Sequence, residues 1–236
     1  MKQKSIPQEV LKLIACLTML IDHFGAAIVI DMNVPYVAPL YYACRIIGRI
    51  AFPIYCFLLA EGMRRTRNPW RYILRLGIGI LLAEIPFDLA LFGGWTWEYQ
   101  SVMVTLTLGA VMILCMQKTE KKWLKPLMVI PFVILAELCK CDYGGWGIAM
   151  IAVFALFEKF PMQLLGVLLV SLLMPSAMLN FFGVPVSIEL PAVAAMLFIG
   201  LYSGKKLTYS KAVQWGFYLF YPVHLMILWL IWMYLL

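Results

Sequence analysis

Apolar runs, each about as long as a bilayer crossing, follow one another through this chain and are separated by short polar breaks. A helix needs about 20 mainly apolar residues to cross a hydrocarbon core about 30 Å thick. Hydrophobic residues make up 64% of the 236 residues and charged residues 13%. Soluble domains are roughly half apolar and about a quarter charged. The sequence therefore excludes a soluble globular or disordered protein and predicts an all-α, polytopic integral membrane bundle.

The breaks divide the chain into about nine predicted membrane-crossing helices that form a single domain, residues 1–236. The first apolar run contains Lys12, Asp22 and His23 and is too long for the apolar core of a signal peptide, so we expect it to be retained as a helix. The sixth helix is short for a crossing, and Pro161 after it suits a turn or kink. The predicted helices cover residues 10–31, 40–62, 71–92, 102–117, 123–138, 146–158, 162–180, 187–203 and 213–235.

Lysine and arginine are distributed unevenly between the two sides that this helix pattern defines. Fifteen of the 19 fall in the breaks, or in the helix ends next to them, on the side of the N-terminus, whereas only Lys140 falls on the opposite side. Lys12, Arg45 and Arg49 lie within helices. Positive residues favour the cytoplasmic side of a membrane, so we predict the N-terminus inside and the C-terminus outside. The net charge of +7 is explained by this topology and not by nucleic-acid binding.

The cysteines and the known catalytic motifs give no metal or nucleophile signal. Four of the six cysteines lie in apolar runs, where they are typical small packing residues. Cys139 and Cys141 flank Lys140 near a predicted loop, but the local sequence supplies no further partners for a metal or redox site. The chain contains no H-x-x-x-H, H-E-x-x-H, Walker A or G-x-S-x-G pattern, and we predict no metal.

Ionisable side chains inside the apolar runs are the strongest functional signal, because a charge at mid-bilayer costs about 2.5–3.5 kcal/mol even on insertion scales. The predicted topology places seven of them between the middle of the bilayer and its outer leaflet, whereas Glu61, Glu137 and Glu189 lie nearer helix ends, where a side chain reaches the interface at little cost. This candidate site consists of Asp22, His23, Arg45, Arg49, Glu84, Asp88 and His224.

The arginines and acids of this set have two interpretations. Arg45 and Arg49 are four residues apart and share a helix face, as do Glu84 and Asp88. Pro86 between the two acids can open its helix and free a carbonyl. These residues either form ion pairs that hold two helices together or belong to a functional site.

The two histidines favour a functional interpretation more strongly, because the chain has no others and both fall within apolar helices. Imidazole titrates near neutrality and suits general-base catalysis. Asp22 and His23 are neighbours and point about 100° apart on a helix, so they need not bond each other. Another acid, such as Glu84 or Asp88, could orient the imidazole.

Several motifs occur in order along nearly the whole chain: DH at 22–23, RIIGR at 45–49, AFP at 51–53, EIPFDL at 84–89 and YPVHL at 221–225. With them the chain resembles the TraX family of multi-spanning membrane acetyltransferases, whose founding activity is N-terminal acetylation of pilin. It is also similar to the acyltransferase-3 membrane enzymes, which use acyl-CoA and carry an essential membrane histidine with arginine partners. Ser101 after Gln100, and Ser203 before Gly204, depart from the TraX pattern without touching the DH or arginine motifs.

The resemblance implies a bacterial inner-membrane enzyme that moves an acetyl group from acetyl-CoA to an amine or hydroxyl acceptor. It implies that His23 is the base and that Arg45 and Arg49 clamp the acyl donor or the transition state. It also places the other members of the candidate set, Asp22, Glu84, Asp88 and His224, in the same site. The sequence does not identify the acceptor. Besides this acceptor, the predicted partners are acetyl-CoA and the lipid bilayer. No nucleic-acid partner is predicted. The CoA phosphates are predicted to bind the cytoplasmic arginines Arg64, Arg65 and Arg67, which could instead serve as topology anchors.

Two other classes stay open. Intramembrane acids and histidines also relay protons in transporters and flippases, although we see no inverted repeat of the kind many transporters have. A non-catalytic partner in a conjugation or secretion assembly is the third class.

Overall fold

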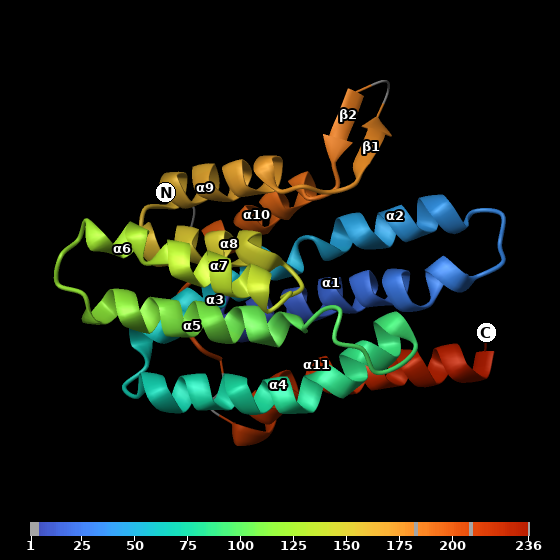
Figure 1. Ribbon diagram of the computed structural model, residues 1–236, viewed down its shortest axis with the longest axis horizontal. Coiled ribbons are helices and arrows are strands. Elements are labelled where there is room, and N and C mark those ends of the chain that lie inside the picture. The colour runs from blue at the N-terminus through green and yellow to red at the C-terminus, as the bar shows by residue number, and fades with distance from the viewer. Residues whose placement is uncertain (1–4, 182–183, 208–209, 236) are drawn as a thin grey trace. The chain divides into compact units, whose positions relative to one another are not determined.

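The computed structural model describes residues 5–181, 184–207 and 210–235, and it is built almost wholly of helices (Figure 1). The chain divides into two compact units, which are described separately below. Unit 1 comprises residues 1–55, 86–95 and 171–236, and unit 2 comprises residues 56–85 and 96–170. Two long helices, α3 (Ala51–Arg65) and α4 (Pro69–Phe92), run from one unit into the other, as does α9 (Phe160–Leu173).

Unit 1 is organised around its first two helices, which lie side by side (Figure 1). A Cβ atom built on Gly48 would lie 2.1 Å from Oδ1 of Asp22, and one on Gly25 would lie 2.6 Å from Cβ of Cys44. Only glycine allows the backbones to approach this closely. The full set of elements in this unit, besides parts of α3 and α4, is α1 (Gln8–Ala27), η1 (Val29–Asp31), α2 (Val37–Gly48), β1 (Met178–Phe181), β2 (Val184–Ser187), η2 (Leu190–Ala194), α10 (Ala195–Gly200) and α11 (Lys211–Leu235).

The predicted helix 40–62 is divided into α2 and α3 at Arg49 and Ile50. Pro53 explains the break, because it lacks the N–H that would bond to the carbonyl of Arg49 in a continuous helix. The amide of Arg49 still bonds to the carbonyl of Arg45 at 3.2 Å. The break therefore leaves Arg49 at the end of a helix, next to Gly48 and the close contact with α1.

The first and last helices of unit 1 run parallel to each other. At one end, Ser203 N donates to the carbonyl of Ile6 at 2.8 Å, so the start of the chain pairs with the segment before α11. At the other end, the indole N–H of Trp232 donates to Oδ2 of Asp31 at 2.8 Å. The beginning of α1 and the end of α11 thus lie at opposite ends of unit 1.

A short antiparallel hairpin replaces part of two predicted helices. The sequence predicts helices over 162–180 and 187–203, whereas α9 ends at Leu173 and β1 pairs with β2 in the register Met178–Ser187 and Leu179–Val186. Pro175 and Pro185 lack amide hydrogens and cannot extend a helix. The chain then continues into η2 and the short α10, so a prediction of helices alone is incomplete here.

Unit 2 is a helical group whose core contains Met112, Ile148, Ile151 and Phe154. Glu137 at the end of α7 accepts a hydrogen bond from the backbone N–H of Gly145 at 2.7 Å and so caps the start of α8. Besides parts of α3, α4 and α9, the elements are α5 (Val102–Lys118), α6 (Leu124–Leu127), α7 (Val129–Leu138) and α8 (Gly144–Leu156).

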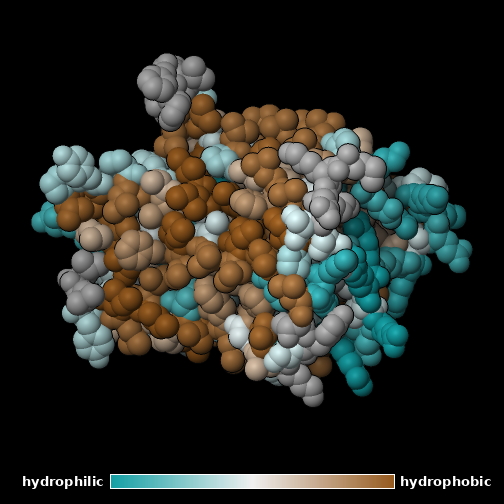
Figure 2. Space-filling model, turned by 180° about the vertical axis from the view of Figure 1, so that it is seen from behind, coloured by the Kyte–Doolittle hydropathy of each residue, from teal (hydrophilic) through white to brown (hydrophobic). Residues whose placement is uncertain are grey.

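Large apolar side chains are exposed on both units. Leu81, Leu138 and Leu197 are 78%, 75% and 70% exposed, and Figure 2 shows hydrophobic residues over most of the visible face. Exposed apolar surface of this extent is expected where lipid is the solvent. Three helical stretches of the described residues, Gln8–Asp31, Val37–Arg65 and Ala212–Tyr234, are long and apolar enough to cross a membrane. These stretches and the exposed apolar surface indicate a helical membrane protein.

Candidate functional site

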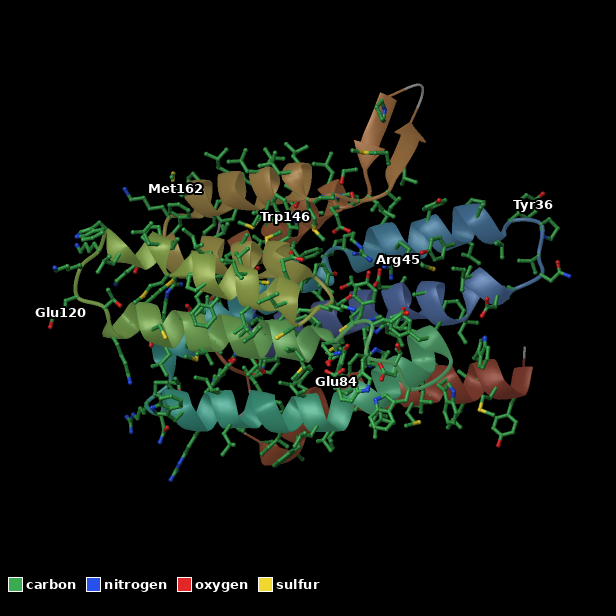
Figure 3. All side chains as sticks on the ribbon, viewed as in Figure 1. Tyr36, Arg45, Glu84, Glu120, Trp146 and Met162 are labelled. Carbon is green, nitrogen blue, oxygen red and sulfur yellow. The ribbon has the colours of Figure 1, made fainter. Side chains whose placement is uncertain are left out.

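Four charged side chains of unit 1 form a buried network where α1 meets α2. Asp22 accepts hydrogen bonds from both arginines of the RIIGR motif: from Nη1 of Arg45 at 2.7 Å and from Nη2 of Arg49 at 3.1 Å. Figure 3 shows Arg45 beside α1 and α2. Nη1 of Arg49 donates to Oε1 of Glu189 at 3.0 Å. The side chains of Asp22, Arg49 and Glu189 are at most 12% exposed, whereas that of Arg45 is 23% exposed.

Glu189, just before η2, is the member of this network that the sequence analysis missed. Its position near a predicted helix end indicated an exposed interfacial acid, yet only 7% of the residue is exposed. With it the network holds two positive and two negative charges. Because buried ions are costly unless paired, the charge balance of the arginines was the signal that could have identified a second acid beside Asp22.

The two histidines lie next to this network and bond to each other. Nδ1 of His23 and Nε2 of His224 are 2.7 Å apart, and both residues are buried. Their ring planes differ by 7° and the ring centroids are 5.0 Å apart. A centroid separation this much longer than the nitrogen–nitrogen distance places the two rings edge to edge in nearly one plane, the alignment that an imidazole N–H needs in order to donate.

The remaining ring nitrogen of His224 fixes the direction of this hydrogen bond. Nδ1 of His224 lies 2.7 Å from the carbonyl oxygen of Phe220, which can only accept. Neutral His224 therefore carries its proton on Nδ1, and its Nε2 accepts from Nδ1 of His23. In the neutral pair, Nε2 of His23 is left as a proton acceptor. The chain of bonds runs from Phe220 through His224 to His23.

The partner at Nδ1 of His23 is His224, where the sequence suggested an acid such as Glu84 or Asp88. Asp88, in the part of α4 that belongs to unit 1, is buried, and Leu91 one turn later packs against Ala27 and Leu228. Tyr221 lies beside both histidines, with ring centroids 6.0 Å from His23 and 5.7 Å from His224.

Glu84 belongs to unit 2, where it binds the start of a helix. Its Oε1 accepts from the hydroxyl of Ser101 at 2.7 Å, and its carboxylate accepts from the backbone N–H of Ser101 at 3.2 Å. Ser101 immediately precedes α5, so Glu84 caps that helix with a negative charge at its positive end. This contact also accounts for a serine after Gln100.

The three arginines predicted to bind CoA differ in the contacts that they make. Nη2 of Arg65 lies 2.5 Å from Oε1 of Glu61, and Arg64 lies 4.0 Å from the same carboxylate group. Arg64 also donates to the backbone carbonyl of Phe154. Arg67 is exposed. Arg64 thus links the end of α3 to α8, whereas the Arg65–Glu61 pair lies within α3.

Cys141, one of the two cysteines near the predicted loop, is buried. Burial raises the pKa of the Cys141 thiol to about 11, so this thiol stays protonated near neutral pH. All six cysteines are free. Among the residues that the structure describes, no group of three His, Cys, Asp or Glu side chains is arranged to hold a metal ion.

Comparison with known proteins agrees with the motifs. The chain is 27% identical over 237 aligned positions to a Dichelobacter nodosus protein described as "Probable fimbrial assembly protein FimC, serogroup H1", with 92% of each chain covered. No solved structure matches. The family described as TraX protein matches residues 7–232, which include the charged network, both histidines and Glu84. The chain therefore belongs to the TraX family.

Proposed function

We propose that this protein is a membrane-embedded acetyltransferase that transfers an acetyl group from acetyl-CoA to an amine or hydroxyl acceptor. Membership of the TraX family and a relative named for fimbrial assembly support an acceptor of the pilin type, presented at a bacterial inner membrane. The observation that carries the proposal is the bond from His224 to His23, which leaves Nε2 of His23 ready to take a proton.

In the proposed reaction His23 is the general base. Its Nε2 removes a proton from the acceptor while the acceptor nitrogen or oxygen attacks the thioester carbonyl of acetyl-CoA. When the tetrahedral intermediate collapses, the carbon–sulfur bond breaks and the proton passes from His23 to the departing CoA sulfur. His224 holds the tautomer and plane of His23 and partly disperses the positive charge that forms on it.

The arginines supply the positive charge for the oxyanion. Arg45 and Arg49 both lie close enough to act electrostatically on His23. Among the described residues, Arg45 uses one guanidinium nitrogen for Asp22 and is the more exposed of the two arginines, so it has donors to offer an oxyanion. Arg49 is held by Asp22 and Glu189 and keeps the pair in place.

For the membrane arrangement we propose about nine crossings, with the N-terminus in the cytoplasm and the C-terminus outside. The parallel run of α1 and α11 supports opposite sides for the two ends of unit 1. Helix α8, with 13 residues, is about 20 Å long and needs a locally thinned bilayer to cross. Reporter fusions at Leu236 and between Lys118 and Lys125 should report opposite sides; the same side for both would refute this topology.

The proposal is tested with the purified full-length protein, acetyl-CoA labelled in the acetyl group, and pilin or small amines as acceptors. Labelled product together with released CoA is the expected result. A buried histidine pair also suits proton movement, so proton flux across proteoliposomes is measured in parallel. Flux without any acetyl transfer would contradict the acetyltransferase and favour a transporter.

A further inference from the structure

A row of side chains on one face of α1 leads from the start of the helix to His23. Lys12, Cys16, Met19 and His23 are spaced at three or four residues, so they share one face of an α-helix. Cys16, Met19 and His23 are buried, and Lys12 is half-buried. All of them belong to unit 1, as do the partners described below.

The end of this row that lies at the start of α1 carries two positive charges close together. The ammonium group of Lys12 lies over the ring of Phe217, 5.2 Å from its centroid. Lys12 and Lys206 are near enough for their charges to repel each other, and Glu9 is an acid that acts on Lys12. Glu9 in turn accepts from the backbone N–H of Leu207 at 2.8 Å. The fold therefore places two lysines and one acid together at the start of the row, and this group has a net positive charge.

The middle and inner parts of the row offer hydrogen-bonding groups between apolar surfaces. Sγ of Cys16 lies 3.3 Å from the hydroxyl of Tyr55, and Tyr55 is also close to Tyr221. Tyr221 lies beside His23 and His224. Thus a positive end is followed by thiol and phenol groups and then by the proposed base.

We propose that Lys12 and Lys206 bind the phosphates of CoA and that its pantetheine arm runs along this face of α1 to His23. This inference rests on the proposed function and moves the donor site away from the Arg64–Arg67 loop. Lysine ammonium groups are good phosphate ligands. Eleven residues of helix separate Lys12 from His23, about 16 Å. The extended arm between the CoA phosphates and the sulfur, about a dozen bonds, spans a similar distance.

Helix α11 is the element that makes room for the arm. Phe217 and Tyr221 of α11 cover the row, but only 22% of the apolar stretch of α11 is buried, compared with 50% for the stretch that contains α1. Pro222 inside α11 removes a backbone hydrogen bond and allows the helix to bend. Displacing the ring of Phe217 from Lys12 would free the ammonium group for phosphate.

The test measures equilibrium binding of CoA and of pantetheine, which lacks the phosphates, to the purified full-length protein. Lys12→Gln and Lys206→Gln should each weaken CoA binding by about tenfold, because each removes a charge-assisted contact to phosphate. Neither should alter pantetheine binding. Lys12→Arg keeps the charge and should stay within a few-fold of the wild type.

Lys118→Gln is the matched control, because Lys118 also lies over an aromatic ring, 5.5 Å from the centroid of Trp70, but belongs to unit 2. It should bind CoA like the wild type. If the Lys12 and Lys206 variants also bind CoA normally, while Arg67→Gln weakens binding, the phosphates lie at the arginine loop and our assignment is wrong. In that case the acetyltransferase itself still stands. If the wild type neither binds CoA nor turns over acetyl-CoA, both proposals fail.

Discussion

Nδ1 of His23 and Nε2 of His224 lie 2.7 Å apart, although 201 residues separate them in the chain. The carbonyl of Phe220 accepts from the other nitrogen of His224 and sets the direction of both bonds. In the proposed reaction His224 is thus a positioning residue, comparable to the acid that orients a catalytic histidine in a triad. Parallel α1 and α11 bring the DH and YPVHL motifs together.

His224→Gln and His224→Ala distinguish positioning from mere packing. The glutamine carbonyl can accept from Nδ1 of His23 as Nε2 of His224 does, whereas alanine cannot. We expect turnover to fall by about tenfold or more in the alanine variant and less in the glutamine variant, with KM for acetyl-CoA nearly unchanged in both. The pH–rate profile should change only in the alanine variant. Equal turnover and identical profiles for the two variants would mean that His224 does not orient His23.

Arg49→Lys should be more damaging than Arg45→Lys. The guanidinium of Arg49 spans Asp22 and Glu189 with separate nitrogens, and a single ammonium group cannot reproduce that fork. Lysine keeps the charge but reaches only one of the two acids, so a lower melting temperature in detergent should accompany the loss of turnover. Arg45 makes one bond to Asp22, and its lysine variant should stay folded but lose turnover, because it lacks the planar fork. Arg75→Lys, in unit 2, is the control. Full turnover in both RIIGR variants would remove the arginines from the mechanism.

Gly48→Ala tests whether the close contact of α1 with α2 is needed. The added Cβ would lie 2.1 Å from Oδ1 and 2.2 Å from Cβ of Asp22, so the carboxylate must move away from the arginines. We expect loss of turnover and a destabilisation of about 1–3 kcal/mol. Gly216→Ala is the matched control, because a Cβ added there would have nothing within 4 Å and alanine favours the helix. A wild-type melting curve and turnover for Gly48→Ala would show that the network tolerates a wider helix spacing.

Part of this site could be predicted from the sequence. Charges inside apolar runs are costly in lipid, so Asp22, His23, Arg45, Arg49 and His224 were identifiable without a structure, and the structure brings all five into one unit. Their partners were not identifiable, because helical periodicity gives the face of a residue but not the helix that the face meets. In the structure the arginines pair with Asp22 and Glu189, whereas the sequence offered Glu84 and Asp88 as their partners.

The depth of a residue was the second difficulty. Counting along full-length helices placed Glu189 at an exposed end, whereas a hairpin and a short 3₁₀ segment bring it to the buried guanidinium of Arg49. Glu84 was predicted at the site because its helix is apolar and carries a second acid. In the structure Glu84 accepts from the Ser101 amide at the start of α5, a partner 17 residues away that helical periodicity does not identify. Local patterns contain no information on such irregular or remote contacts.

Turnover of His23→Ala is the most direct test of the central claim. General-base catalysis typically contributes about 10²–10⁴-fold, so acetyl transfer should fall by about that factor. CoA affinity should stay within a few-fold of the wild type, because the imidazole acts on the acceptor, and the melting curve in detergent should be retained. Normal acetyl transfer by folded His23→Ala would contradict the account, and the same variant turning over normally beside an inactive His224→Ala would exchange the roles of the two histidines.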